Sequence, residues 1–133
     1  MSLEEEEGFT VKKEVNAKGQ NIYIFIFKKG FTNEQFMEYL AILNKLLELK
    51  IPFLMLIDTT KVLHVPVRAS ILLINWMKRR RRDIPDVLLG SSVVVLSSTV
   101  ATIINGAFKI QKPVSPNKIT TSYEASLKFL NDI

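Results

Sequence analysis

The segment that decides the fold is Phe53-Leu54-Met55-Leu56-Ile57-Asp58-Thr59-Thr60, in which an apolar run leads into a short polar tip. A run of this kind, bounded by polar residues, predicts a strand that is buried on both faces of a sheet. The chain then passes through Pro66 into an apolar helix that ends in Lys78-Arg79-Arg80-Arg81-Arg82. Strand, polar tip and helix form one arm of an α/β unit, where ligands bind at the carboxyl ends of strands.

Two strands and a helix are predicted before this segment. Residues 9–15 alternate between apolar and polar, which indicates a strand near a sheet edge with one exposed face. The apolar run 22–27 predicts a buried strand, and the short turn at Gly19 makes the two an antiparallel hairpin. Thr32, with Gln35 three residues later, fits a capping box for a helix that runs to about Lys50.

The remainder of the chain predicts two more strands and three helices. Pro66 suits the first turn of the second helix, and residues 83–86 end that helix. Residues 91–96 are expected to form a strand, followed by a helix from Ser97 or Ser98 to about 110. A short strand near Ile119 precedes a last helix, opened by a capping box of Thr121 and Glu124. The predicted fold class is α/β, a mixed four- or five-stranded sheet flanked by helices in the order β-β-α-β-α-β-α-β-α.

Composition limits the classes of function. The 133 residues include no cysteine, so disulfides, thiolate chemistry and cysteine zinc sites are excluded. The net charge is +5, and residues 67–133 alone carry +6. This basic half could contact an acidic protein, a phospholipid surface or nucleic acid, or it could simply be exposed to solvent, which is the favoured interpretation. No run approaches the roughly 18 apolar residues of a membrane span. The sequence carries no nucleotide-binding or other cofactor motif.

The acidic residues at the start of the chain bear on the cellular location of the protein and on its division into domains. Residues 4–7 are all glutamate, unlike a secretory signal or a mitochondrial transit peptide, so we expect a cytoplasmic protein. Residues 1–8 are predicted to form a disordered acidic segment. Residues 9–133 are predicted to form a single domain.

The candidate ligand- or partner-binding residues are Asp58, Thr59, Thr60 and His64. Asp58 at the strand tip could bind a ligand hydroxyl or a partner amide, or it could accept N–H bonds from its own loop. The same alternatives hold for Thr59 and Thr60. His64 is the sole histidine, so no second histidine offers a metal pair, and a turn or surface role is favoured over catalysis.

The basic run is the second candidate site. It consists of Lys78, Arg79, Arg80, Arg81 and Arg82, which on one helix would cover every side and so could not all face a core. It is either a solvated helix end, whose cations favour the helix dipole, or a patch for anionic lipid headgroups. Nucleic-acid phosphate is a third alternative, less favoured because no exposed-aromatic pattern accompanies the run.

Two apolar features remain open to alternative interpretations. Trp76 and Met77 could anchor the protein at a membrane interface, but large apolar side chains at helical spacing are more often core. The predicted helix around 99–108 has small residues that could line a ligand cavity or allow close packing on the sheet. Close packing is the preferred interpretation.

This element order, with Leu56-Ile57-Asp58 closing the third strand and Glu124–Leu130 in a last helix, resembles the STAS domain over residues 9–132. It is most similar to the stand-alone SpoIIAA-like proteins, which are related in structure to Sec14-type lipid carriers. Antagonist STAS domains have a phosphorylatable serine after the Asp-ended strand, where this chain has His64-Val65-Pro66-Val67. The resemblance therefore implies a module without the phospho-serine switch.

The function expected from the sequence is a non-catalytic binding or signalling module that acts through protein–protein contacts, with a protein partner or by self-association. The alternative is a carrier or sensor of an apolar, lipid-like ligand that docks on anionic membranes through Lys78–Arg82. An enzyme of unrecognised type ranks below both. No cofactor and no metal are expected.

Overall fold

A mixed five-stranded sheet forms the centre of the molecule, as seen in a computed structural model that describes residues 8–133. The strands lie side by side in sequence order: β1 (Phe9–Val15), β2 (Asn21–Phe27), β3 (Phe53–Asp58), β4 (Leu88–Val94) and β5 (Asn117–Thr120). β1 is antiparallel to β2, and every later pair is parallel. The predicted fold class is therefore confirmed.

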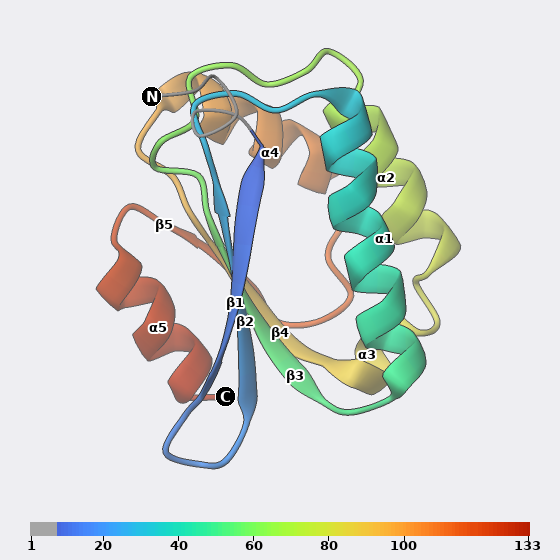
Figure 1. Cartoon of the computed structure of the whole chain (residues 1–133), viewed down its shortest axis with the longest axis vertical. Coiled ribbons are helices and arrows are strands. Elements are labelled where there is room, and N and C mark those ends of the chain that lie inside the picture. Colours follow the sequence, from blue (N-terminus) through green and yellow to red (C-terminus); the bar gives the residue numbers. More distant parts are fainter. Residues whose placement is uncertain (1–7) are drawn as a thin grey trace.

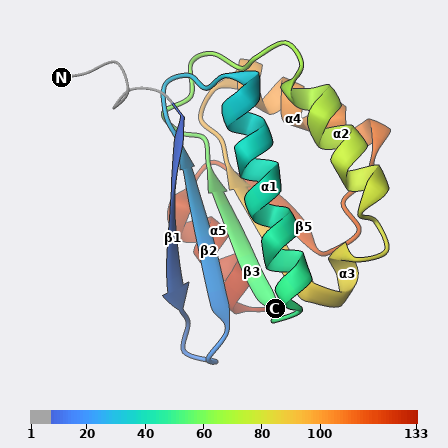
Figure 2. The same ribbon diagram turned by 45° about the vertical axis from the view of Figure 1, so that its right-hand side comes forward.

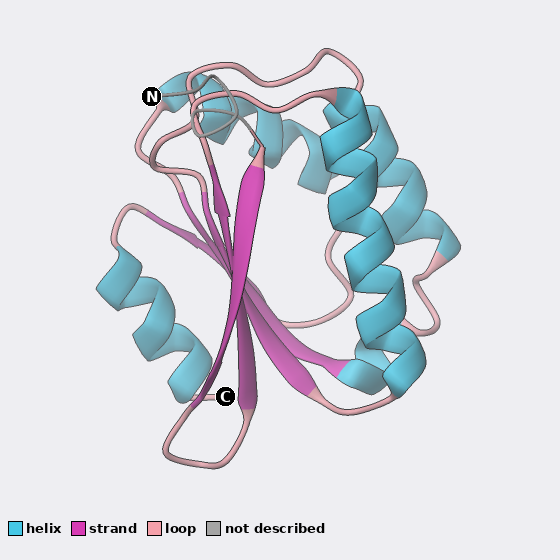
Figure 3. Cartoon of the chain, viewed as in Figure 1, coloured by secondary structure: helices cyan, strands magenta, loops and turns pink. Residues whose placement is uncertain are grey.

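The helices divide between the two faces of the sheet. They are α1 (Asn33–Leu49), α2 (Ala69–Arg79), α3 (Ile84–Val87), α4 (Ser98–Ile110) and α5 (Tyr123–Asn131). Figure 1 shows the sheet nearly edge-on, with α1, α2 and α4 on one side and α5 on the other. The turned view in Figure 2 shows α1 along the face of the sheet, with α2 next to it on the side away from β1. Figure 3 distinguishes helices from strands by colour.

Side-chain alternation along the central strands builds a core on each face. In β3, Leu54 and Leu56 pack with Leu130 of α5, whereas Met55 belongs to the larger cluster beneath α1 and α2. Both groups are buried, because β3 lies in the middle of the sheet and has helices on both sides. This explains why the strand lacks polar alternation.

A chain of buried hydroxyl groups fixes α5 on its face of the sheet. The Ser92 hydroxyl of β4 donates to Ser126 of α5 at 2.6 Å, and Ser126 lies 2.7 Å from the hydroxyl oxygen of Thr120. Ser92 and Ser126 are fully buried. Because each of these hydroxyls has a partner, polar groups can lie inside an otherwise apolar layer.

Two helix caps and one turn agree with the sequence, and one helix cap differs. Thr32 and Gln35 form the predicted capping box of α1, and Ser97 caps α4. Gly19 has a positive φ of 76°, as expected for the hairpin turn. α5 is capped by Ser122, whose hydroxyl accepts from the Ala125 N–H, so the predicted box starting at Thr121 is wrong by one residue.

Other boundaries differ from the predictions for local reasons. α2 begins at Ala69, with Pro66 in the preceding turn, and the expected break at 83–86 contains the short helix α3. β4 runs from Leu88 to Val94, earlier than predicted, because its pairing with β3 begins at Leu88. β1 spans the predicted residues 9–15 at the sheet edge and pairs antiparallel with β2, but it is exposed along both faces beyond Phe9, where one buried face was expected.

The acidic segment predicted at 1–8 lies outside the described residues except for its last member. Gly8 is buried, and its N–H donates to the Gly30 carbonyl at 2.7 Å. Gly8 also accepts from the Lys28 N–H at 2.9 Å, which continues the hydrogen bonding between β1 and β2. The prediction of disorder is therefore wrong at Gly8.

The capping box of α1 gives a direct test of local stability. Thr32→Ala removes the hydroxyl that accepts from the Gln35 N–H at 3.0 Å, and should lower the free energy of unfolding by about 1 kcal/mol. Urea denaturation measures the change. Thr32→Ser should retain most of the stability, and Thr102→Ala on the exposed side of α4 serves as control. Equal losses in the Ala and Ser variants would contradict the capping role.

Candidate functional site

The strand tip after β3 is a hydrogen-bonded turn. The Asp58 carboxylate accepts the Thr60 N–H at 2.9 Å, the bond typical of an aspartate turn. The Thr59 hydroxyl is buried and donates to the Val94 carbonyl at 2.7 Å, which also accepts the Thr59 N–H at 3.0 Å. Both residues thus have structural partners in the sheet and its turn, and their binding role stays a prediction.

The four predicted binding residues do not form one site. Alternation along β3 places Asp58 on the α5 side of the sheet and Thr59 on the α1 side. Burial raises the pKa of the Tyr123 phenol at the start of α5, with Glu14 and Asp58 adding to the rise and Lys12 opposing it. Asp58 therefore belongs to a charged group beside α5.

His64 lies further along the loop that follows the strand tip. Its side chain is exposed, and its backbone N–H donates to the Lys29 carbonyl at 3.2 Å. The Leu63 N–H donates to the same oxygen at 2.8 Å, so Lys29 anchors the loop that follows the strand tip. Among residues 8–133, no group of three or more His, Asp or Glu side chains is arranged to hold a metal ion.

The basic run is divided by the end of α2. Only Lys78 and Arg79 are helical, and Arg80 is the C-cap residue, so the run predicted as one continuous helix is wrong from Arg80 onward. Arg80 is half-buried, lies 3.6 Å from Asp83 and reaches the Asn44 carbonyl of α1 at 3.5 Å. Lys78, Arg79, Arg81 and Arg82 are exposed.

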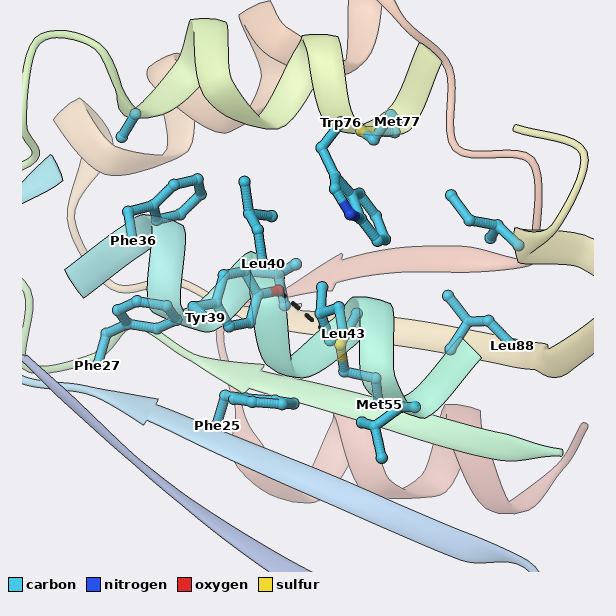
Figure 4. Packing of buried hydrophobic residues seen from close by; sticks show 14 of the residues in the cluster. Phe25, Phe27, Phe36, Tyr39, Leu40, Leu43, Met55, Trp76, Met77 and Leu88 are labelled. Atoms are coloured by element: carbon cyan, nitrogen blue, oxygen red, sulfur yellow. Dashed lines mark hydrogen bonds between the residues drawn. The ribbon is translucent and has the colours of Figure 1, made fainter. Parts of the chain in front are cut away.

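Trp76 and Met77 belong to the core. Figure 4 shows the Trp76 side chain extending from α2 toward α1, with Met77 next to it on α2. The Trp76 indole N–H donates to the Asn44 side chain at 2.7 Å, and Trp76 is only 5% exposed. The preferred interpretation of these residues as core is therefore confirmed, and Trp76 also positions the end of α2 against α1.

An apolar cavity of about 140 Å³ lies between the sheet and the helices on the α1 side. Its floor includes Met55, Ile57 and Val93 from the sheet. α1 contributes Phe36 and Tyr39, α2 contributes Leu73 and Trp76, and α4 contributes Ile104, Ala107 and Phe108. The lining reaches the surface at Val114, which is 42% exposed in the loop between α4 and β5.

The walls of this cavity are uncharged. No Asp, Glu, Lys, Arg or His of residues 8–133 lines it, and its few polar side chains are hydroxyl and amide groups. Burial raises the pKa of the Tyr39 phenol far above its ordinary range, so this hydroxyl stays protonated. The Tyr39 hydroxyl points toward the Met55 sulfur at 3.8 Å, the dashed line in Figure 4.

α4 differs in part from the expectation of close packing on the sheet. Val100 and Ala107 are buried, but α4 packs chiefly against α2, and its apolar side chains face the cavity. The alternative interpretation from the sequence, a helix that lines a cavity, therefore describes α4 better. The small side chain of Ala107 leaves room between α4 and the sheet.

Comparison with solved structures identifies the fold. The structure resembles an uncharacterised protein of the DUF3478 family from Shewanella loihica PV-4, which has a SpoIIAA-like fold, with a TM-score of 0.66. The match covers 92% of this chain and 93% of the other, at 13% sequence identity. This chain has a SpoIIAA-like fold. No family model and no curated protein matches its sequence.

The SpoIIAA-like fold confirms the resemblance inferred from the sequence, as far as the fold is concerned.

Among the described helices, none is both long and apolar enough to cross a bilayer.

Sequence reasoning missed four polar residues of the cavity, Ser70, Ser91, Ser115 and Asn117, of which the last three bear on what it could bind. Ser91 appeared only as the start of a predicted strand, and Ser115 and Asn117 lie between the helix predicted to end near 110 and the short strand predicted near Ile119. Their proximity follows from the parallel pairing of Ser91 with Asn117, which requires the strand order to be known. The polar residues Ser91 and Ser92 in the middle of β4, where a core strand would be all apolar, were the one available signal.

Proposed function

We propose that the protein is a non-catalytic binding module of SpoIIAA-like fold that holds a small apolar molecule in the cavity between α1, α2, α4 and the sheet. The observation that carries this proposal is the cavity itself, which has apolar walls and lies beside an exposed rim at Val114. Apolar cavities of about this volume take up benzene-sized molecules. The absence of Asp, Glu, Lys and His from the described walls supports binding over chemistry.

The proposal retains one of the two roles expected from the sequence, a carrier or sensor of an apolar ligand. In this view Lys78, Arg79, Arg81 and Arg82 bring the protein to anionic membranes, where apolar ligands partition. Arg80 has a structural role, because its side chain hydrogen-bonds the Asn44 carbonyl of α1 from the end of α2. The exposed cations are therefore the ones to test.

Filling the cavity should abolish binding of toluene as an apolar probe. In wild-type protein, toluene at about five times its dissociation constant should stabilise the fold by about 1 kcal/mol, or ~4 °C in melting temperature. Ala107→Leu places an isobutyl group in the cavity and should remove that shift. Calorimetric titration and thermal melting measure the two effects.

The matched control for this experiment is Ala41→Leu, the same substitution on the exposed side of α1. It should leave the toluene shift unchanged. A wild-type protein that toluene does not stabilise, or a shift that survives in Ala107→Leu, would refute ligand binding in this cavity.

Removal of three exposed arginines should weaken membrane association. The combined change of Arg79, Arg81 and Arg82 to Gln should reduce partitioning onto phosphatidylserine-containing vesicles roughly a hundredfold at low salt, at about 1 kcal/mol per residue. Sedimentation with the vesicles measures the partition coefficient. The combined change of Lys12, Lys13 and Lys18 to Gln alters net charge equally at the β1–β2 hairpin. Equal losses in both variants would mean that net charge alone drives the binding, which would contradict a specific role of the arginines.

A second candidate function, contact with another protein molecule, is favoured by exposed apolar residues after the strand tip. Val67 is 91% exposed, Leu63 64% and Ile71 54%, and they lie in the loop and first turn where the sequence predicts partner contacts. Exposed apolar residues that adjoin one another are typical of interaction surfaces. A second copy of this chain is the partner proposed.

Self-association should depend on these apolar residues. Sedimentation velocity over a range of concentrations should detect dimers of the wild-type protein, and the pair Val67→Ser with Ile71→Ser should shift the equilibrium at least tenfold toward monomer. The control pair is Leu49→Ser with Ile51→Ser, which changes comparably exposed apolar residues between α1 and β3. A wild-type monomer at every concentration would exclude self-association.

A further inference from the structure

A buried hydroxyl group lies in the wall of the cavity without a hydrogen-bond partner. Ser115, in the loop between α4 and β5, is 8% exposed, and its hydroxyl oxygen finds no donor or acceptor among residues 8–133. Buried hydroxyls in folded proteins are nearly always paired, because desolvation without a partner is unfavourable. An unpaired hydroxyl in the wall of a cavity is therefore a candidate contact for a bound molecule.

Two further polar groups lie beside Ser115. The Asn117 side-chain amide of β5 donates to the Ser91 hydroxyl oxygen of β4 at 2.8 Å, and both residues line the cavity. No acceptor in the described part of the chain takes the Ser91 hydroxyl proton, which leaves it able to donate. The Ser91 N–H donates to the Pro116 carbonyl at 2.9 Å, so the loop that carries Ser115 is held against β4.

We propose that Ser115, with Ser91 and Asn117 beside it, forms a polar subsite that hydrogen-bonds the single hydroxyl or carbonyl group of a small neutral ligand. The inference rests on the proposed function and deepens it, because it specifies which class of apolar molecule the cavity takes. The rest of that molecule lies against the apolar residues of α1, α2 and α4.

The charge and size of the ligand follow from the walls. A carboxylate or an ammonium group would be buried in this cavity without a charged partner, which strongly disfavours ionised ligands. The volume of about 140 Å³ is close to that of an engineered apolar cavity, of about 150 Å³, that binds benzene in another protein. The ligand class is thus a single ring or a short aliphatic chain with one polar group, such as a phenol or a short alcohol.

The test compares phenol with toluene, which differ in their ability to hydrogen-bond and have similar size. Calorimetric titration gives both dissociation constants for the wild-type protein and for Ser115→Ala. The variant should lose about tenfold in affinity for phenol, the loss expected for one neutral hydrogen bond, and keep its affinity for toluene. Ser98→Ala, the same substitution at the exposed start of α4, should change neither constant.

Each outcome bears on the inference. Because the Ser115 hydroxyl has no partner within the described chain, its removal should not lower the melting temperature, and a large loss of stability would indicate a structural role instead. An unchanged ratio of phenol to toluene affinity in Ser115→Ala would overturn the polar subsite while the apolar cavity stands. Failure of both probes to bind wild-type protein would overturn the proposed function, and this inference with it.

Discussion

The burial of β3 between two helical layers is the constraint on which the rest of the structure depends. Because β3 is central and parallel to both neighbours, its residues from Phe53 to Leu56 are all buried in one core or the other. Leu54 and Leu56 meet the face covered by α5, and Met55 meets the face covered by α1 and α2. The two layers differ in packing. α5 lies directly on β4 and β5 and is joined to them by hydroxyl groups, whereas α4 packs on α2 and leaves a cavity over the sheet.

Features set by neighbouring residues were predictable from the sequence. The strand at 53–58 follows from an unbroken apolar run, and the α1 cap follows from Thr32 and Gln35 in contact across one helical turn. The end of α2 was not predictable, because it depends on Trp76 and Arg80 reaching Asn44 in a helix more than thirty residues earlier. The basic run alone favours helix as readily as it favours a turn.

In the candidate site, too, local features were predictable from the sequence and features that depend on distant residues were not. Asp58, Thr59 and Thr60 stand out in the sequence because polar residues end an apolar run, yet the structure gives Asp58 and Thr59 local hydrogen bonds. Ser91 and Ser115 are unremarkable in sequence. They become notable only when strand pairing brings Asn117 beside Ser91 and when α4 leaves Ser115 facing apolar walls. A cavity is a property of the space between distant elements, so no local pattern encodes it.

The exposed first strand has a consequence for how the protein can meet other chains. Both edges of an open sheet offer unpaired backbone groups, and strand-by-strand addition at such an edge is a common route to aggregation. Here the outer strand β1 carries Lys12, Lys13 and Glu14, all exposed, and the opposite edge, β5, is only four residues long and carries Lys118. Charge on one edge and shortness on the other disfavour sheet extension, so specific contacts are directed to the helices and loops.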